Sequence, residues 1–297
     1  MKSKKEIKSS SAAASFYDNV HLDYLNWSSQ LNIHFGYFKM GMNPFGLESM
    51  LRQMNEEVAK RAGISKHRHL HLLDAGCGVG EGLFQLAGGH PKCRFTGINI
   101  SQKQIAFGNK KLEKSKLKKQ VKLLNCDFQK TPFPAAHFDC AFAIESACYA
   151  DGKDKSAFIS EMARVLKNGG KLVVADGFLR HSKPLPKWLD RLHKKNLTLW
   201  SIEELADIQS FVEKLESNGF QRISVEEASW NILPSALHLP FTAIKIYWKR
   251  FFFKKKKKLT AAQKNYAKAI WLTLFLGMFR RHFGYFIITV ELIRPGH

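Results

Sequence analysis

The 297-residue sequence is short of acidic residues, of cysteine and of long apolar runs. Its 25 Asp and Glu face 47 Lys and Arg, which gives a formal net charge of +22. The five cysteines are odd in number and contain no C-x-x-C pair. They therefore favour neither a disulfide framework nor a structural zinc site, and we expect no metal. No uncharged apolar run reaches the roughly 18 residues that cross a bilayer. These absences favour a protein of the reducing cytosol.

The positive charge is concentrated in clusters. Seven lysines fall within residues 110–122, a pattern typical of a solvated helix face and loop. A second cluster, residues 251–258, places three phenylalanines before five lysines. Rings at headgroup depth and lysines at phosphates suit an anionic lipid surface, so this segment predicts peripheral membrane contact. A solvated loop and nucleic acid remain alternatives. The lysines and serines of residues 1–15 predict a disordered basic tail, with a transit peptide as the alternative.

Short apolar runs alternate with helical patterns from about residue 67 onward. This alternation is typical of an α/β protein with a parallel sheet. We expect strands at 69–74, 95–100, 121–126, 138–145, 171–176, 222–227 and 284–293, and helices at 82–87, 101–115, 154–167 and 201–218. Ser101 is the expected N-cap of the second helix.

The segments outside this alternation define the expected domains. Residues 16–66 are expected to form a helical N-terminal arm, and residues 180–200 a loop. Residues 231–282 are aromatic and lysine-rich and predict a cap inserted between the last two strands. The core then comprises residues 67–230 and 283–295.

The most informative segment is L-L-D-A-G-C-G-V-G-E-G at residues 72–82. Glycines after a strand and before a helix let the backbone pass close to a ligand at the carboxyl end of the sheet. The spacing is G-x-G-x-G and not the G-x-G-x-x-G of a dinucleotide site. Asp74, two residues before the first glycine, would repel a pyrophosphate and attract an ammonium group. The sequence therefore favours a ligand with an amino group.

The D-A-G-C-G-V-G segment resembles motif I of the class I S-adenosylmethionine-dependent methyltransferases. Further landmarks occur in that family's order: G-I-N-I-S at 97–101, N-C-D-F at 125–128, a fourth strand at 138–145 and A-R-V-L-K-N-G-G at 163–170. The resemblance implies a Rossmann-like, mostly parallel sheet of seven strands and S-adenosylmethionine as the cofactor.

The same resemblance implies roles for individual residues. Asp74 would lie near the amino group of the cofactor, and Asp127 would accept a hydrogen bond from the adenine amino group. Asn99 stands where many members have an acid that binds the ribose hydroxyls, so it would bind them without charge assistance. The full set expected at the cofactor is Asp74, Gly76, Cys77, Gly78, Gly80, Asn99, Ile100, Gln104, Asp127, Phe128 and Tyr37.

Within the family, the sequence resembles sterol and tocopherol C-methyltransferases and small-molecule O- and N-methyltransferases. The carriers are N-I-H-F-G-Y-F at 32–38, G-I-N-I-S, and I-E-S-A-C-Y at 144–149. Glu145 is the expected carboxylate, as a base or as a stabiliser of positive charge. Tyr149 stands where that branch often has His, and a phenol with a pKa near 10 needs a neighbour to act as a base. His34 is the third catalytic candidate.

The apolar and aromatic residues of the cap suit a small hydrophobic acceptor such as an isoprenoid, sterol, quinone or lipid. RNA methylation is the alternative that the charge suggests, but E-S-A-C at 145–148 is not the Asn/Asp-Pro-Pro-aromatic motif of base methyltransferases. Nucleic acid is therefore not the expected partner. Protein methylation and a non-catalytic membrane- or partner-binding domain are further alternatives. The acceptor atom and the oligomeric state stay open.

Overall fold

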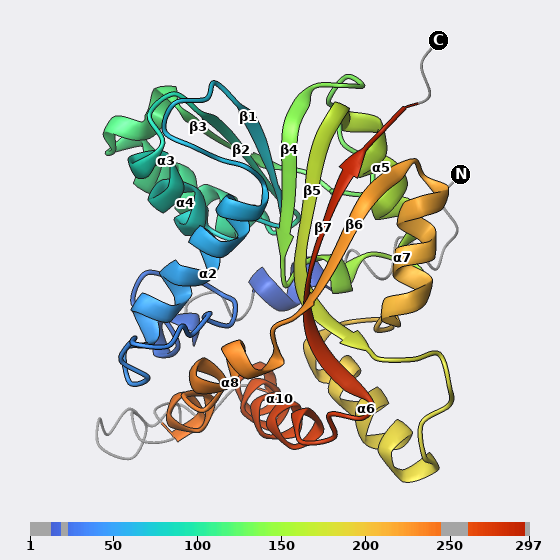
Figure 1. Cartoon of the computed structure of the whole chain (residues 1–297). Coiled ribbons are helices and arrows are strands. Elements are labelled where there is room, and N and C mark those ends of the chain that lie inside the picture. The colour runs from blue at the N-terminus through green and yellow to red at the C-terminus, as the bar shows by residue number, and fades with distance from the viewer. Residues whose placement is uncertain (1–12, 19–22, 245–260, 295–297) are drawn as a thin grey trace.

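The computed structural model describes residues 13–18, 23–244 and 261–294 (Figure 1). The expected membrane segment at 251–258 and most of the basic tail lie outside the described residues.

The core is a seven-stranded sheet in the order β3-β2-β1-β4-β5-β7-β6. All neighbouring strands are parallel except that β7 runs antiparallel to both β5 and β6. This sheet confirms the expected fold class. The strands are β1 (His71–Ala75), β2 (Arg94–Asn99), β3 (Val121–Asn125), β4 (Phe138–Ile144), β5 (Leu166–Leu179), β6 (Phe220–Glu227) and β7 (Phe283–Leu292).

Helices cover both faces of the sheet. Successive side chains of a strand point to opposite faces, so the apolar side chains on each face need helices to bury them. In β1, Leu72 packs with the helices of one face and Leu73 with those of the other. The first face carries α2 (Leu47–Arg61), α3 (Glu81–Gly89) and α4 (Gln102–Glu113), and the second carries α5 (Ser156–Val165) and α7 (Ile208–Ser217). Single 3₁₀ turns occur at Asp23–Asn26, Lys116–Lys119 and Ala147–Tyr149.

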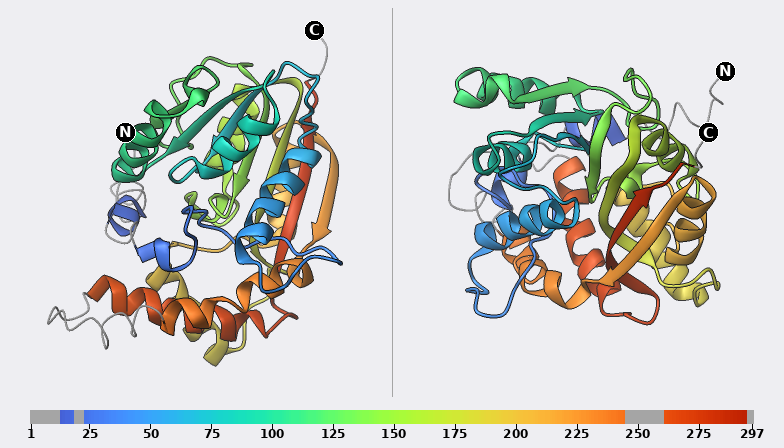
Figure 2. Two further views of the ribbon diagram at one scale, coloured as in Figure 1. Left: turned by 90° about the vertical axis from the view of Figure 1, so that its left-hand side faces the viewer. Right: turned by 45° about the horizontal axis from the view of Figure 1, so that its top comes forward.

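Three further helices form a layer beyond the carboxyl ends of the parallel strands (Figures 1 and 2). They are α6 (Lys187–Trp200), α8 (Ser229–Ala236) and α10 (Ala261–Gly277). The Trp200 indole at the end of α6 donates to the Thr273 hydroxyl of α10 at 2.8 Å. Since α8 and α10 lie between β6 and β7 in the chain, a cap is inserted between the last two strands. No helix among the described residues is long and apolar enough to span a membrane.

Several expected boundaries were wrong. The helix expected from residue 201 begins only at Ile208, where the Asp207 side chain accepts from the Ser210 backbone N–H at 2.9 Å. Ser201 instead has a left-handed backbone and ends α6, a helix in the segment expected to be a loop. Residues 13–18 are helical, so the expected tail is too long at its end. Most of residues 27–46 in the expected helical arm have no regular structure.

The glycine turn at residues 76–80 is held by very close backbone packing. A Cβ atom built on Gly108 of α4 would lie 2.3 Å from the carbonyl oxygen of Val79. One built on Gly97 of β2 would lie 2.8 Å from the Cys77 sulfur. Both distances are shorter than van der Waals contact, so only glycine lets β2 and α4 approach the turn this closely.

Gly108→Ala tests this packing. Alanine favours a helix over glycine by about 1 kcal/mol, but here its methyl group meets a backbone oxygen that moves only if α4 or the turn moves. We expect the clash to dominate and the free energy of unfolding to fall by about 1–3 kcal/mol in urea titrations. Gly88→Ala in α3 is the control, because its added Cβ meets nothing within 4 Å. Equal stability of the two variants would contradict the described packing.

Candidate active site

The glycine turn joins β1 to α3 at the carboxyl edge of the sheet. Gly76, Gly78 and Gly80 have φ angles of 120°, 56° and 85°, in the region that favours glycine. A Cβ on Gly76 would lie 2.3 Å from the Ser146 side chain, so that glycine is needed for packing. Gly78 is different, because no atom of the described residues lies within 4 Å of its Cβ position. The turn therefore presents bare backbone to open space at Gly78.

Asp74, at the end of β1, is a buried carboxylate. Asp74 is 8% exposed, and no described residue donates a hydrogen bond to its side chain. Burial alone raises the pKa of Asp74 to about 8. A carboxyl group in this position gains most from a cationic ligand, because the ligand would supply the missing hydrogen bonds and charge. Cys77 lies beside it, and burial raises the pKa of its thiol as well.

The end of β2 is tied to the glycine turn. The Asn99 amide donates to the carbonyl oxygen of Gly78 at 3.1 Å and to the side-chain oxygen of Gln104 at 2.6 Å. Gln104 is 1% exposed, and its amide nitrogen has no hydrogen-bond partner among the described residues. Ile100 accepts from the Asn125 amide at 2.9 Å. A buried amide without a partner is costly, so Gln104 is poised to donate to a ligand.

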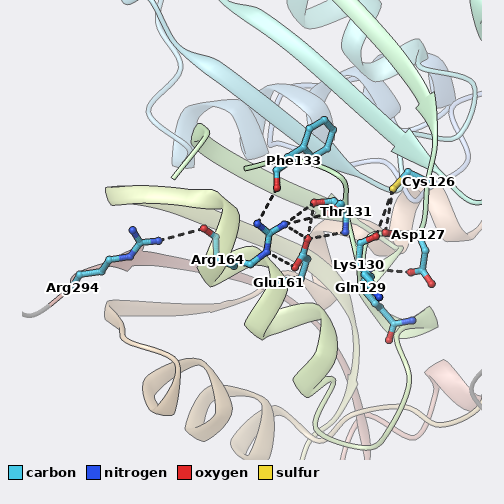
Figure 3. Close-up of polar contacts among 9 residues, drawn as sticks. All are labelled: Cys126, Asp127, Gln129, Lys130, Thr131, Phe133, Glu161, Arg164 and Arg294. Carbon is cyan, nitrogen blue, oxygen red and sulfur yellow. Dashed lines mark hydrogen bonds and ion pairs between the residues drawn. The ribbon is translucent and has the colours of Figure 1, made fainter. Parts of the chain in front are cut away.

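The loop after β3 carries Asp127 and Phe128. Asp127 accepts from the Gln129 backbone N–H at 2.9 Å, and the Phe128 ring packs edge-on against Phe158 of α5 at 5.3 Å. Beyond them, Glu161 of α5 accepts from the backbone N–H and the hydroxyl of Thr131 at 2.7 and 2.6 Å. Figure 3 shows this anchor, in which Arg164 also pairs with Glu161. The hydrogen bonds of Glu161 to Thr131 and of Arg164 to the Phe133 carbonyl attach the loop that carries Asp127 to α5.

A cavity of about 730 Å³ extends from this edge of the sheet into the cap. Its lining is mostly aliphatic and aromatic, and includes Ile33, Leu197, Trp200, Leu239, Leu274 and Met278. Among the described residues, the acidic side chains that line it are Glu145, which directly follows β4, and Asp176, which lies within β5. The described residues contain no group of three or more His, Cys, Asp or Glu side chains placed to hold a metal ion.

Glu145, at the wall of the cavity, has a left-handed backbone. Its φ angle is 50°, uncommon for any residue but glycine, and its N–H donates to Ala175 of β5 at 2.8 Å. One carboxylate oxygen accepts from the Phe35 N–H at 2.6 Å and from the Tyr285 hydroxyl at 3.0 Å. Burial nevertheless raises the pKa of Glu145 to about 8. The second carboxylate oxygen has no such partner among the described residues.

Asp176 is a second buried carboxylate that the sequence analysis missed. It accepts from the backbone N–H groups of Cys148 and Gly177 at 2.9 and 2.8 Å, and burial raises its pKa to about 6. Its place at the end of a predicted strand was a usable signal. Lys155, 1% exposed, supports the same loop by donating to the carbonyl oxygens of Cys148, Ala150 and Glu204 at 3.1, 2.7 and 2.8 Å.

The other predicted residues divide between the cavity and the protein core. His34 and Tyr149 line the cavity with Glu145, so the structure brings the three catalytic candidates together. Burial lowers the pKa of His34, which keeps the ring neutral at neutral pH. Tyr37 does not line the cavity. Its ring lies 6.0 Å from the Arg61 guanidinium of α2 and packs against the hydrophobic core between α2 and the sheet.

Residues 13–18, none of which is among the predicted site residues, contact the site. The Tyr17 ring lies 5.5 Å from Tyr149, and Phe16 lies 6.1 Å from Trp200 of α6. Asp18 accepts from the hydroxyl of Ser101, the confirmed N-cap of α4, at 2.5 Å. This helical segment therefore connects the glycine-turn side of the site to the cap.

Comparison with known proteins agrees with this geometry. A model of the methyltransferase domain matches residues 73–174. The chain is 31% identical over 191 residues to the O-methyltransferase rstn1 of Aspergillus nomiae, covering 64% of this chain and 81% of that protein. It is 30% identical over 202 residues to the sterol 4-C-methyltransferase strm-1 of Caenorhabditis elegans, covering 66% of this chain and 58% of the relative.

Solved structures share the fold. The cyclopropane synthase MmaA2 from Mycobacterium tuberculosis superposes with a TM-score of 0.76 at 16% identity, covering 94% of this chain and 97% of that one. The [4+2]-cyclase SpnF superposes with a TM-score of 0.73 at 22% identity, covering 95% of each chain. With a curated methyltransferase matched over four fifths of its length and the glycine turn at the expected edge of the sheet, the chain belongs to the class I S-adenosylmethionine-dependent methyltransferases.

Proposed function

We propose that this enzyme methylates a small hydrophobic acceptor bound in the cavity beneath the cap. The observation that carries the proposal is the cavity itself. It has a volume of about 730 Å³, its walls are mostly apolar, and the Glu145 carboxylate lines it. An apolar site with few polar groups binds an apolar molecule and orients it through those groups. The relatives named for sterol and 2-methyl-6-phytyl-1,4-hydroquinone methylation act on acceptors of this kind.

The residues in and around the glycine turn fit S-adenosylmethionine. Asp74 offers an unpaired carboxylate to an amino group, Gly78 leaves space beside bare backbone, and Gln104 has an unused amide donor. Asn99 would lie at the ribose, and Asp127 with Phe128 at the adenine. When bound, the cofactor supplies an electrophilic methyl group on its sulfonium.

Glu145 would act on the acceptor. Phe35 and Tyr285 fix one of its oxygens, which leaves the other to take a proton from an acceptor hydroxyl or to stabilise positive charge on an acceptor carbon. Either task needs the ionised carboxylate. The apolar walls exclude water and strengthen such electrostatic interactions. His34 and Tyr149 would position the acceptor from the arm and from the turn after β4.

RNA methylation is the second candidate because of the net charge of +22. The cavity argues against it, since no lysine lines it and Arg280 is its one arginine among the described residues. Phosphate contacts normally supply much of the affinity for nucleic acid, and such a lining provides few of them.

Gly78→Arg tests the cofactor assignment. An arginine there would occupy the open space beside the turn, so we expect affinity for S-adenosylhomocysteine to fall at least about 100-fold in calorimetric titrations, a loss of about 2.7 kcal/mol. Gly41→Arg is the matched control, because Gly41 also has a positive φ angle and nothing within 4 Å of its Cβ position. Similar affinity in both variants would place the cofactor elsewhere.

Glu145→Gln tests the acceptor carboxylate. Because the pKa of Glu145 is about 8, we expect kcat/KM of the wild type to rise with pH and level off above pH 8. The variant should lose about 100-fold or more in rate and keep its cofactor affinity. The raised pKa also means that ionisation favours unfolding. The unfolding free energy should therefore fall less between pH 6 and 9 in the variant. An active variant with an unchanged pH profile would exclude this role.

Transfer of labelled methyl from S-adenosylmethionine into an extract of the source cells tests the acceptor class. We expect label in the organic-solvent fraction, because the cavity is apolar. Label in the RNA or protein fraction would overturn the proposal, and heat-inactivated enzyme supplies the background.

A further inference from the structure

Exposed apolar side chains gather on the cap. Of the fourteen large hydrophobic residues exposed among the described parts of the chain, eight belong to residues 230–278. We call this set the cap face; it consists of Trp230, Leu233, Leu237, Phe241, Ile244, Trp271, Phe275 and Met278. Scattered apolar residues are normal on a protein surface, but a concentration on one set of helices indicates an interaction surface.

The cavity opens on the cap face. Trp230, Leu237 and Met278 line the cavity and are also 66%, 57% and 76% exposed. A side chain that does both lies at the mouth. The mouth is therefore rimmed by apolar residues, whereas an entrance for a water-soluble substrate is expected to be polar.

The charge around the cap face is strongly positive. Residues 187–200, 229–244 and 261–282, which contain the cap helices, hold eight Lys and Arg and a single acidic residue, Asp190. The lysines of α6 and α10 are exposed. At the mouth, the Arg280 guanidinium lies 4.0 Å from the centre of the exposed Trp230 ring. Tryptophan beside a basic side chain is the pairing expected at the depth of lipid headgroups.

We propose that the cap face docks on an anionic lipid surface, and that the acceptor enters the cavity from that surface. The second half rests on the proposed function; the first does not. Apolar side chains would enter the boundary between headgroups and acyl chains, and the surrounding basic residues would bind lipid phosphates. The acceptor would then pass from lipid into an apolar cavity without crossing water. This assigns membrane contact to described residues of the cap helices, independently of the segment at 251–258.

Flotation of the full chain with vesicles tests docking without methyl donor or acceptor. We expect binding to vesicles of phosphatidylcholine with 30% phosphatidylserine to exceed binding to phosphatidylcholine alone by about tenfold, and to weaken in high salt. The combined variant Phe241→Ser, Trp271→Ser should reduce binding by about fivefold or more. Both residues are exposed, and neither lines the cavity.

Phe107→Ser on α4 is the matched control, because Phe107 is 40% exposed and lies outside the cap. It should bind vesicles as the wild type does, and circular dichroism should show all variants folded. Failure of the wild type to bind vesicles would overturn the proposal. Unchanged binding by the double variant would assign membrane contact to another segment and also overturn it. Dissociation of an oligomer by the double variant, with vesicle binding unchanged, would identify the cap face as a contact between copies.

Methyl transfer to a detergent-solubilised acceptor separates the two proposals. Vesicle binding with no label in the organic fraction would leave docking intact and reject the acceptor class. Label in that fraction with no vesicle binding would support the acceptor class and reject docking.

Discussion

The Glu145 carboxylate connects three parts of the chain that are far apart in sequence. It follows β4, it accepts from Phe35 110 residues earlier, and it accepts from Tyr285 140 residues later. The N-terminal arm, the sheet and the antiparallel strand β7 therefore meet at one side chain. The cavity lies between these parts, so its shape at the sheet edge depends on their hydrogen bonds to Glu145. A left-handed backbone at that residue directs the side chain into the cavity region.

Three carboxylates at this edge resist ionisation. Burial raises the pKa of Asp74, Glu145 and Asp176, although Glu145 and Asp176 also accept hydrogen bonds. A carboxylate buried without a cation costs folding free energy, and proteins tolerate this cost where a ligand or a reaction uses the charge. The donors at Asp176 and the three carbonyl contacts of Lys155 hold the loop around Cys148 in place. The same edge thus combines a rigid frame with carboxyl groups whose burial favours the neutral form.

The shared fold does not decide the chemistry. A [4+2]-cyclase and a cyclopropane synthase superpose on nearly the whole chain, yet their names describe different reactions. The residues that bear on its chemistry lie in its cavity and cap, where apolar walls, Glu145 and the Trp230–Arg280 pair occur together. The reaction therefore depends on these residues and not on the sheet.

The sequence by itself determined the sheet, the glycine turn and the edge at which the site lies. These features depend on local patterns: alternating apolar runs, glycines at fixed spacing, and acids at the ends of strands, as at Asp74 and Asp127. The local pattern predicted neither α6 nor the start of α7 correctly, because Ser201 ends α6 through a left-handed backbone conformation that the sequence pattern does not indicate. Only the tertiary structure brought Phe35, Asp176 and Tyr285 to Glu145, joined Tyr17 to Tyr149, and opened the cavity on the cap face. Those contacts join distant segments, and the burial that shifts the carboxylate pKa values exists only once the chain has packed.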